Sequence, residues 1–146
     1  MSLVNASETD LLELIFQAVT WNNIAENDST TPATAFYVSL HTANPGETGS
    51  QTTSETAYGS YARQSVARTT AGWAVTGNTA DNAGAITFPE ATSGPSTVTY
   101  WGVGFDLTGA GTLLAYGTID TPTAGLVVNT GVQPQFAAGA LDITLD

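Results

Sequence analysis

The chain has 146 residues, with 13 acidic side chains, two arginines and no lysine, so its formal net charge is −11. It lacks the clustered basic side chains that bind a phosphate backbone or an anionic membrane surface, and we expect neither nucleic acid nor a membrane as a partner. The absence of cysteine excludes disulfides and thiolate metal sites, while a hydrophobic fraction of 42% predicts a globular protein.

The first predicted element is an amphipathic helix that begins near Ser7. A serine suits the N-cap position, and Asp10 lies near the positive end of the helix dipole. Apolar side chains then recur at helical spacing up to about Trp21. The stripe consists of Leu11, Leu12, Ile15, Ala18 and Val19. We expect it to pack on the rest of the fold or on a neighbouring copy.

Short strands follow, and the first of them, over 36–41, alternates apolar and polar side chains as a half-buried strand does. Further strands are expected over 58–68, 73–76, 85–88, 98–105, 113–119, 126–129 and 141–145. Gly, Pro, Asn and Ser between them have the composition of turns. Residues 105–116 are predicted to form a β-hairpin in which Gly109 and Gly111 adopt positive φ angles.

These elements predict a mainly β protein: a single antiparallel β-sandwich or jelly-roll-like domain with one N-terminal α-helix and long loops. We expect one domain over 1–146, with the helix and a linker in 1–31 and the β-sandwich in 32–146. The apolar segments are too short to span a bilayer, and the first residues lack the basic start of a secretory signal.

A long polar excursion, residues 43–60, separates the first two predicted strands. It is rich in Ser, Thr and Gly and contains Pro45. We expect an extended arm that adds contacts, or a strand, to a neighbouring molecule. Arg63, which follows it, and Arg68 are each expected to pair with a carboxylate, and one buried or interfacial pair would fix orientation.

Catalytic and metal-binding patterns are weak. His41 is the one histidine, and although Ser39, Ser60 and Asp106 complete a triad on paper, no nucleophile-elbow pattern is present. We therefore expect His41 to be a surface or inter-subunit hydrogen-bonding residue. A calcium site using the loops at 27–28 or 81–82 stays open, but no catalytic, cofactor-binding or metal-binding residues are predicted.

The tryptophans admit two interpretations. Trp21, Trp73 and Trp101 could offer aromatic faces to a sugar, or Trp73 and Trp101 could fill the core of a small β-sandwich. We favour the core, because no two of the three tryptophans occur in one loop.

Over residues 36–146 the chain resembles a family of small tailed-bacteriophage virion proteins, whose members are labelled tail fibre proteins or head decoration proteins. The distinctive stretches are LHTANPGE at 40–47, Tyr-x-x-Tyr-Ala-Arg at 58–63, Ile-Thr-Phe-Pro at 86–89 and Trp-Gly-Val-Gly at 101–104. The resemblance implies a non-enzymatic structural protein, made in the host cytoplasm and present in many copies on a virion.

From this resemblance we expect a capsid decoration, or cement, protein on the outer face of the major capsid protein, located on the capsid surface rather than the tail. It would form a homo-oligomer such as a trimer. The alternative is a tail or tail-fibre component that binds a host receptor or glycan. The predicted interface residues are Leu11, Leu12, Ile15, Val19, Pro45, Glu47, Tyr58, Tyr61 and Arg63.

Overall fold

The computed structural model describes residues 5–21, 32–120, 122 and 124–145. The chain divides into two compact units, each described separately below. Unit 1 comprises Met1–Ala35, Val66–Ile86 and Phe136–Asp146, and unit 2 comprises Phe36–Ser65 and Thr87–Gln135.

One helix and eleven strands are present in the described part of the chain. The helix is α1 (Asn5–Gln17), and the strands are β1 (Ala35–His41), β2 (Gln64–Ala67), β3 (Trp73–Thr76), β4 (Thr79–Asn82), β5 (Ile86–Thr87), β6 (Ser96–Val98), β7 (Tyr100–Gly104), β8 (Leu113–Thr118), β9 (Leu126–Val128), β10 (Gln135–Phe136) and β11 (Asp142–Thr144).

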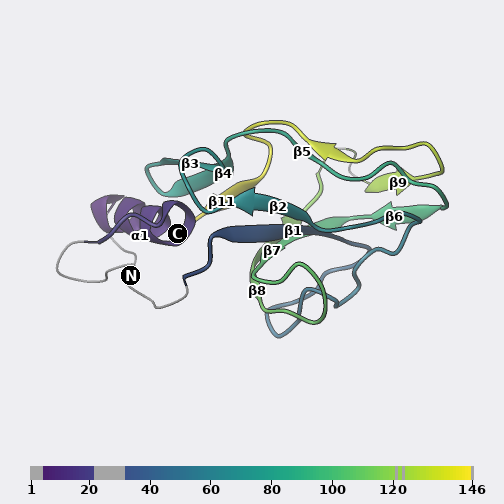
Figure 1. Cartoon of the computed structure of the whole chain (residues 1–146), viewed down its shortest axis with the longest axis horizontal. Coiled ribbons are helices and arrows are strands. Elements are labelled where there is room, and N and C mark those ends of the chain that lie inside the picture. The colour runs from purple at the N-terminus through teal and green to yellow at the C-terminus, as the bar shows by residue number, and fades with distance from the viewer. Residues whose placement is uncertain (1–4, 22–31, 121, 123, 146) are drawn as a thin grey trace. The chain divides into compact units, whose positions relative to one another are not determined.

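Unit 1 is formed by α1 packed on the antiparallel sheet β11-β4-β3 (Figure 1). Helix α1 buries Leu12, which belongs to the predicted apolar stripe, and Phe16, which does not. The Phe16 ring lies 4.7 Å from the ring of the fully buried Trp73, centroid to centroid. Strands β3 and β4 form a tight hairpin whose turn contains Gly77 at a φ of 60°. Burial of large apolar side chains is therefore the main source of cohesion in this unit.

The C-terminal end of α1 is held by Arg68. Its guanidinium donates hydrogen bonds to the carbonyls of Leu14 and Ile15, in the last turn of the helix. These carbonyls lack partners within the helix, and a cation there also complements the helix dipole. Arg68 thus acts as a helix cap in unit 1.

The main sheet has the strand order β2-β1-β7-β8, and a separate antiparallel pair, β6-β9, lies in unit 2. Strand β1 runs antiparallel to β7 with Ser39 opposite Gly102. From Val38 to His41 every side chain of β1 is buried, the polar ones included. The interior of unit 2 therefore contains hydrogen-bonding groups that need partners.

The predicted mainly β class, the antiparallel pairing and the N-terminal helix are confirmed, and the described strands form open sheets rather than a closed barrel. The prediction of a half-buried first strand is wrong, because both faces of β1 are covered. The strand over 79–82 was missed, since its sequence TADN has low β-propensity and is held by pairing with β3 and β11.

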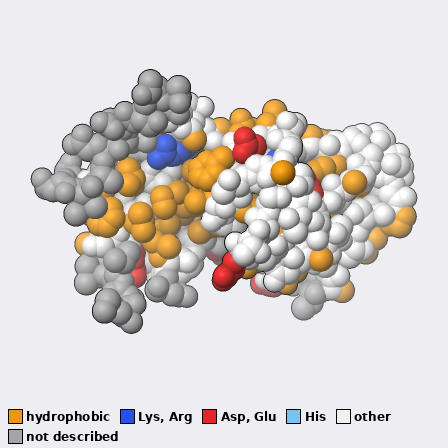
Figure 2. All heavy atoms as spheres, turned by 90° about the horizontal axis from the view of Figure 1, so that it is seen from below, with side chains coloured by type: hydrophobic (Ala, Val, Ile, Leu, Met, Phe, Trp, Pro, Cys, Tyr) orange, Lys and Arg blue, Asp and Glu red, His pale blue; other side chains and the backbone are white. Residues whose placement is uncertain are grey.

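Among the described residues, no helix is long and apolar enough to cross a membrane. The face shown in Figure 2 is dominated by neutral polar and hydrophobic side chains, with acidic groups scattered over it and few basic ones.

Candidate functional site: a buried polar network and the edge of its sheet

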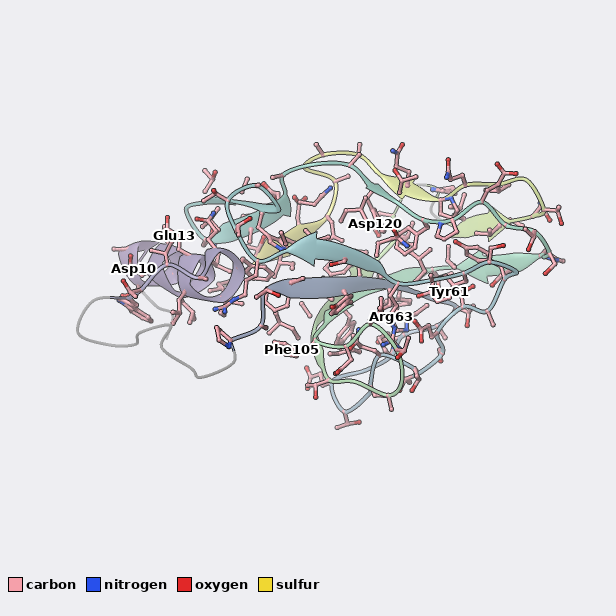
Figure 3. The ribbon with its side chains drawn as sticks, in the orientation of Figure 1. Asp10, Glu13, Tyr61, Arg63, Phe105 and Asp120 are labelled. Atoms are coloured by element: carbon pink, nitrogen blue, oxygen red, sulfur yellow. The ribbon has the colours of Figure 1, made fainter. Side chains whose placement is uncertain are left out.

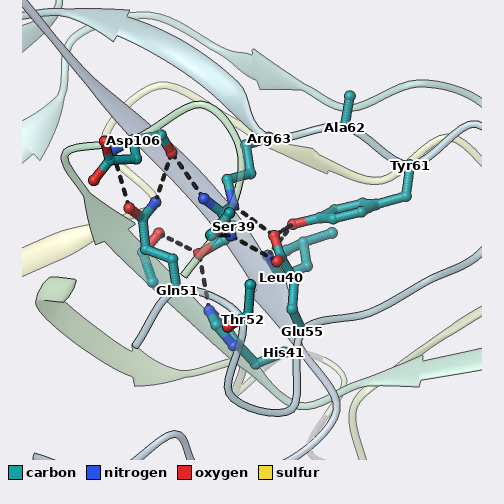
Figure 4. Close-up of polar contacts among 12 residues, drawn as sticks. Ser39, Leu40, His41, Gln51, Thr52, Glu55, Tyr61, Ala62, Arg63 and Asp106 are labelled. Carbon is teal, nitrogen blue, oxygen red and sulfur yellow. Dashed lines mark hydrogen bonds and ion pairs between the residues drawn. The ribbon is translucent and has the colours of Figure 1, made fainter. Parts of the chain in front are cut away.

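A network of polar side chains links the 43–60 segment of unit 2 to strand β1 and to the loop between β7 and β8 (Figure 4). We call it the polar network; its members are Ser39, His41, Gln51, Glu55, Tyr61 and Arg63. These residues come from β1 and from the loops before β2, so they meet only when the chain folds back on the sheet.

Arg63 is the centre of the polar network. Its Nε and Nη2 donate to the two carboxylate oxygens of Glu55 at 2.7 and 2.8 Å, which is the bidentate geometry that arginine favours. The remaining donors bind the carbonyls of Asp106 and Gly109 at 2.8 and 2.7 Å. The side chain of Arg63 is 3% exposed and that of Glu55 14%. The buried guanidinium charge is tolerated here because it forms an ion pair and its donors are hydrogen-bonded.

Tyr61 extends the polar network to the backbone of β1. Its hydroxyl donates to Glu55 Oε1 at 2.8 Å and accepts the N–H of Leu40 at 3.1 Å. Burial raises the pKa of Tyr61 well above its usual range. The hydrogen bonds from Arg63 to Glu55 likewise raise the pKa of Arg63. At neutral pH Tyr61 is therefore neutral and Arg63 is charged. The ion pair of Arg63 with Glu55 is defined by their 2.7 Å contact.

Gln51 fastens the loop between β7 and β8 from the other side. Its side-chain amide donates to the carbonyl of Asp106 at 3.1 Å and accepts the N–H of the same residue at 3.0 Å. Its own backbone N–H donates to the carbonyl of Gly111 at 2.8 Å. Because Gln51 is fully buried, this pairing satisfies an amide that would otherwise be costly to bury.

His41 and Ser39 form the third part of the polar network. The His41 Nε2 and Ser39 Oγ atoms are 2.8 Å apart, and Nδ1 lies 2.8 Å from the carbonyl oxygen of Thr53. Burial lowers the pKa of His41. The distance matches that of a nucleophile and its base, but both side chains are fully buried, so no substrate can reach the pair.

Two glycines of β7 leave the space that these side chains fill. A Cβ on Gly102 would lie 2.7 Å from His41 Nε2 and 2.9 Å from Ser39 Oγ. A Cβ on Gly104 would lie 2.3 Å from the side-chain carbonyl carbon of Gln51. The alternating glycines of the Trp-Gly-Val-Gly stretch face the same side of the strand and thus have a steric role.

The hairpin between β7 and β8 was predicted in part. It forms, and Gly109 has the expected positive φ, of 80°. Gly111 is glycine for a different reason, since a Cβ there would lie 2.2 Å from Asp106 Oδ2 and 2.5 Å from Gln51 Oε1.

Two further expectations require correction. The 43–60 segment is not an extended arm, because Pro45, Gln51, Thr56 and Tyr58 are buried and the segment is hydrogen-bonded to the sheet. His41 is not a surface residue, because it lies under this segment. In both cases exposure was predicted because the residues are polar. They are buried because each buried polar group has a hydrogen-bond partner in the fold.

The predicted interface residues lie in different environments. Leu12 is buried in unit 1, and Pro45, Tyr58 and Arg63 are buried in unit 2. Tyr61, Leu11 and Ile15 are half-buried, while Glu47 is exposed and Val19 is 42% exposed. Figure 3 shows Tyr61 and Arg63 close together beside β1. The role of these residues at an interface stays a prediction, best suited to the exposed members.

The expected pairing of Arg63 with a carboxylate is confirmed, and so is the placement of two tryptophans in the interior. Trp73 is 0% and Trp101 8% exposed. Neither presents the open aromatic face that stacking on a sugar requires.

In unit 1, two carboxylates face each other across β4 and β11, where Asp81 is directly opposite Asp142. Burial, together with the hydrogen bond to Asp142 and its charge, raises the pKa of Asp81 to about 6. The described residues contain no group of three His, Cys, Asp or Glu that could hold a metal ion. The side chain of Asn82 is bonded to the carbonyls of Gly84 and Ala137, and the 27–28 loop lies outside the described residues.

The outer edge of the main sheet is the second feature of the site. Strand β8 ends the strand order, and a shallow pocket of about 210 Å³ runs beside it, lined by Gly46, Glu47 and the β8 residues Leu113, Leu114, Ala115 and Tyr116. The adjoining loop exposes two large apolar side chains, Phe105 at 42% and Leu107 at 51%. Phe105 is labelled in Figure 3.

Sequence reasoning missed Gln51, which joins the excursion to the loop between β7 and β8. A signal was present in the glycine pair of the Trp-Gly-Val-Gly stretch, because alternating glycines on a strand indicate that another group approaches its backbone closely. Which residue approaches could not be read from local sequence.

Comparison with known proteins gives one family. No curated protein matches the chain. A family model described as podophage GP4 fiber I protein gp80 matches residues 3–144, which is almost the entire length. Its range includes the helix as well as the β-rich region that carried the resemblance noted above. The chain therefore belongs to the family of the podophage GP4 fiber I protein gp80, a family of phage virion structural proteins.

Proposed function

We propose that this chain is a structural component of a phage fibre, which acts by binding other proteins and has no catalytic activity of its own. The observation that carries the proposal is the family match over residues 3–144, because it covers both compact units. The virion location follows from the family, and the fibre is the part of the particle that the family description names.

The polar network supports a binding role. The Ser39–His41 pair, which has the spacing of a catalytic pair, is sealed inside unit 2 and bonded to backbone carbonyls. Arg63 and Gln51 hold the surface loops in one conformation. A binding surface that is ordered before it meets its partner loses less conformational entropy on association.

Locating the chain in intact particles tests this proposal. Particles purified by density gradient should contain the chain, and cryo-electron microscopy with a tagged copy should place the tag on a fibre. Finding the chain only in lysates of infected cells, and not in purified particles, would refute the structural role.

The second candidate is a capsid decoration protein bound to the outer face of the major capsid protein. The net charge of −11 favours it, because an acidic protein is repelled by packaged DNA and suits the outside of the shell. Quantitative mass spectrometry separates the candidates. A copy number close to that of the major capsid protein indicates decoration, whereas a far smaller number indicates a fibre.

The assembly state is a separate part of the proposal. We propose a homo-oligomer, with a trimer as the first expectation, and sedimentation velocity on purified protein measures it. If the protein were a monomer at all accessible concentrations, the homo-oligomer would be wrong, and the chain would have to join the particle by binding other virion proteins.

A further inference from the structure

We infer that the outer edge of β8 is a docking site for an extended, basic segment of another protein, which adds a strand to the main sheet. The inference rests on the proposed role of this chain as a binding component and specifies the chemistry of its partner. Addition of a strand to an open edge is a common mode of peptide recognition, in which backbone hydrogen bonds supply much of the affinity.

The hydrogen-bonding groups of β8 show which residues are free at this edge. Ile119 donates its N–H to the carbonyl of Thr99, and bonded and non-bonded pairs alternate along an antiparallel ladder. The bonded pairs are therefore Trp101–Gly117 and Val103–Ala115. Tyr116 and Thr118 direct their N–H and C=O groups outward, and no described strand pairs with β8 on that side.

The chain itself pairs with this side of the sheet at one point. Ser50 forms an antiparallel bridge with Thr112, just before β8 begins. Beyond this bridge the 43–60 segment forms no described strand pairing with β8, and Gly46 and Glu47 line a pocket together with residues 113–116. An incoming segment would continue the pairing where Ser50 ends it.

The sequence of β8, LLAYGT, contains neither a charged residue nor a proline. Edge strands in soluble proteins are usually guarded by such residues against pairing with other chains. The bulge between Val103 and Gly104 distorts only the first part of β8, which leaves the ladder regular from Ala115 onward. The outward N–H and C=O groups of Tyr116 and Thr118 are thus available to pair with another strand.

The charge at this edge indicates a basic partner. Glu47 is exposed and lines the pocket, and Asp120 follows the last residue of β8. A second copy of this chain cannot supply the opposite charge. It has no lysine, and its two arginines are both engaged internally, Arg63 by Glu55 and Arg68 by the carbonyls of α1. We therefore assign the site to a different protein with Lys or Arg in an extended segment.

The experiment uses the purified full-length chain and two short synthetic peptides, one alternating lysine and valine and the other alternating glutamate and valine. The lysine peptide should bind, measured by fluorescence anisotropy, and should shift the NMR amide signals of Leu113–Thr118. The glutamate peptide should bind far more weakly. Equal binding of both peptides, or shifts confined to other parts of the chain, would contradict the inference.

A matched pair of variants separates the backbone edge from the side chain at position 116. Tyr116→Pro removes an outward N–H, and proline is accepted at such positions of an edge strand. Tyr116→Ala removes the same side chain and keeps the N–H. Tyr116→Pro should bind the lysine peptide about tenfold more weakly than Tyr116→Ala, as expected from the loss of one edge hydrogen bond. Equal affinities in two folded variants would overturn the proposed edge pairing.

A second pair tests the charge. Glu47→Gln should weaken binding of the lysine peptide about threefold, while Glu90→Gln, which changes an exposed carboxylate outside the pocket, should leave it unchanged. If sedimentation velocity showed a dimer of the wild-type chain that Tyr116→Pro dissociates, the occupant would be a second copy and the basic partner would be wrong. Because these assays use the isolated chain, they are independent of where the protein lies in the particle.

Discussion

The two compact units of this small chain are stabilised in different ways. Unit 1 places Phe16 and Trp73 at its centre, where one face of a helix covers a three-stranded sheet. Each unit encloses one fully buried amide, Asn82 in unit 1 and Gln51 in unit 2, but unit 2 also encloses an ion pair and a histidine. The stability of an apolar core depends on how closely its side chains pack. The stability of a polar network depends on every buried polar group forming its hydrogen bonds.

The difference has a consequence for function. A hydrogen-bonded network fixes the loops that it joins, and in unit 2 those loops flank the open edge of the main sheet. The apolar core of unit 1 fixes a helix on a sheet and uses Arg68 to hold the end of that helix. We therefore expect substitutions in unit 2 to alter binding surfaces as well as stability.

The largest effect is expected for Arg63→Met. The substitution leaves Glu55 buried without its cation and frees the carbonyls of Asp106 and Gly109, so the free energy of unfolding should fall by about 3–5 kcal/mol. Urea denaturation followed by tryptophan fluorescence and by NMR measures this loss. The double variant Arg63→Met with Glu55→Met should recover part of the stability, since it removes the unpaired charge. No recovery would mean that the carbonyl contacts, rather than the ion pair, dominate.

A smaller loss is expected in unit 1 for Leu12→Ala. Leu12 is 1% exposed, and its truncation should cost about 2–4 kcal/mol through lost apolar burial and a cavity. Leu11→Ala, on a half-buried neighbour, is the matched control and should cost less. Amide exchange should show the loss mainly in α1, β3 and β4. An equal loss in β7 would indicate that the two units unfold together.

Replacing glycine by alanine should destabilise the fold next to the polar network, but not at an open position on the surface of unit 1. Gly102→Ala would bring a methyl group against His41, Ser39 and Leu113, and should destabilise unit 2 by about 1–3 kcal/mol. Gly84→Ala in unit 1 has open space around it and should be neutral or slightly stabilising. Thermal unfolding of the two variants compares them directly. A neutral Gly102→Ala would show that the side chains beneath β7 can move aside.

The smallest effects concern pH, and the two units should respond in opposite directions. Burial lowers the pKa of His41, so unit 2 has its full stability above about pH 6.5, the usual histidine value, and loses stability as the pH falls below it. The pKa of Asp81 is raised to about 6, so the stability this group contributes to unit 1 is present at low pH and is lost as the pH rises through about 6.

Amide exchange between pH 5 and 7.5, corrected for intrinsic rates, measures these opposite trends in β7 and β4. Asp142→Asn should reduce the pH dependence of β4 and raise its stability at pH 7.5 by roughly 0.5 kcal/mol, the usual scale for like charges opposite each other in a sheet. Because burial is the larger cause of the raised Asp81 pKa, part of the dependence should remain. Parallel trends in β4 and β7 would contradict the opposite pH responses.

Much of the fold was predictable because it depends on local pattern. The apolar stripe predicted α1, and turn residues separated strands that the structure confirms at β1, β3 and β8. The helix ends earlier than expected, at Gln17, where Ala18 adopts a positive φ of 58°. The two-residue strand β10 was not predicted, because so short a segment has no period of its own, whereas β5 lies within the strand expected over 85–88.

The site was less predictable than the fold. Arg63 was expected to pair with a carboxylate, but thirteen acidic residues were available and sequence did not indicate Glu55. The polar network also joins residues that are far apart in the chain, since Gln51 bonds to Asp106. The prediction of an exposed arm came from the average polarity of the 43–60 segment, which does not reveal whether each polar group has a partner.

The sequence by itself determined the mainly β class, the N-terminal helix and the exclusion of cysteine chemistry, since these follow from composition and from periodicity along the chain. Only the tertiary structure decided that Ser39, His41 and Gln51 are interior residues and that β8 is an open edge. The physical reason is that the cost of burying a polar group depends on the position of its partner, and here the partners are brought together by the pairing of β1, β7 and β8.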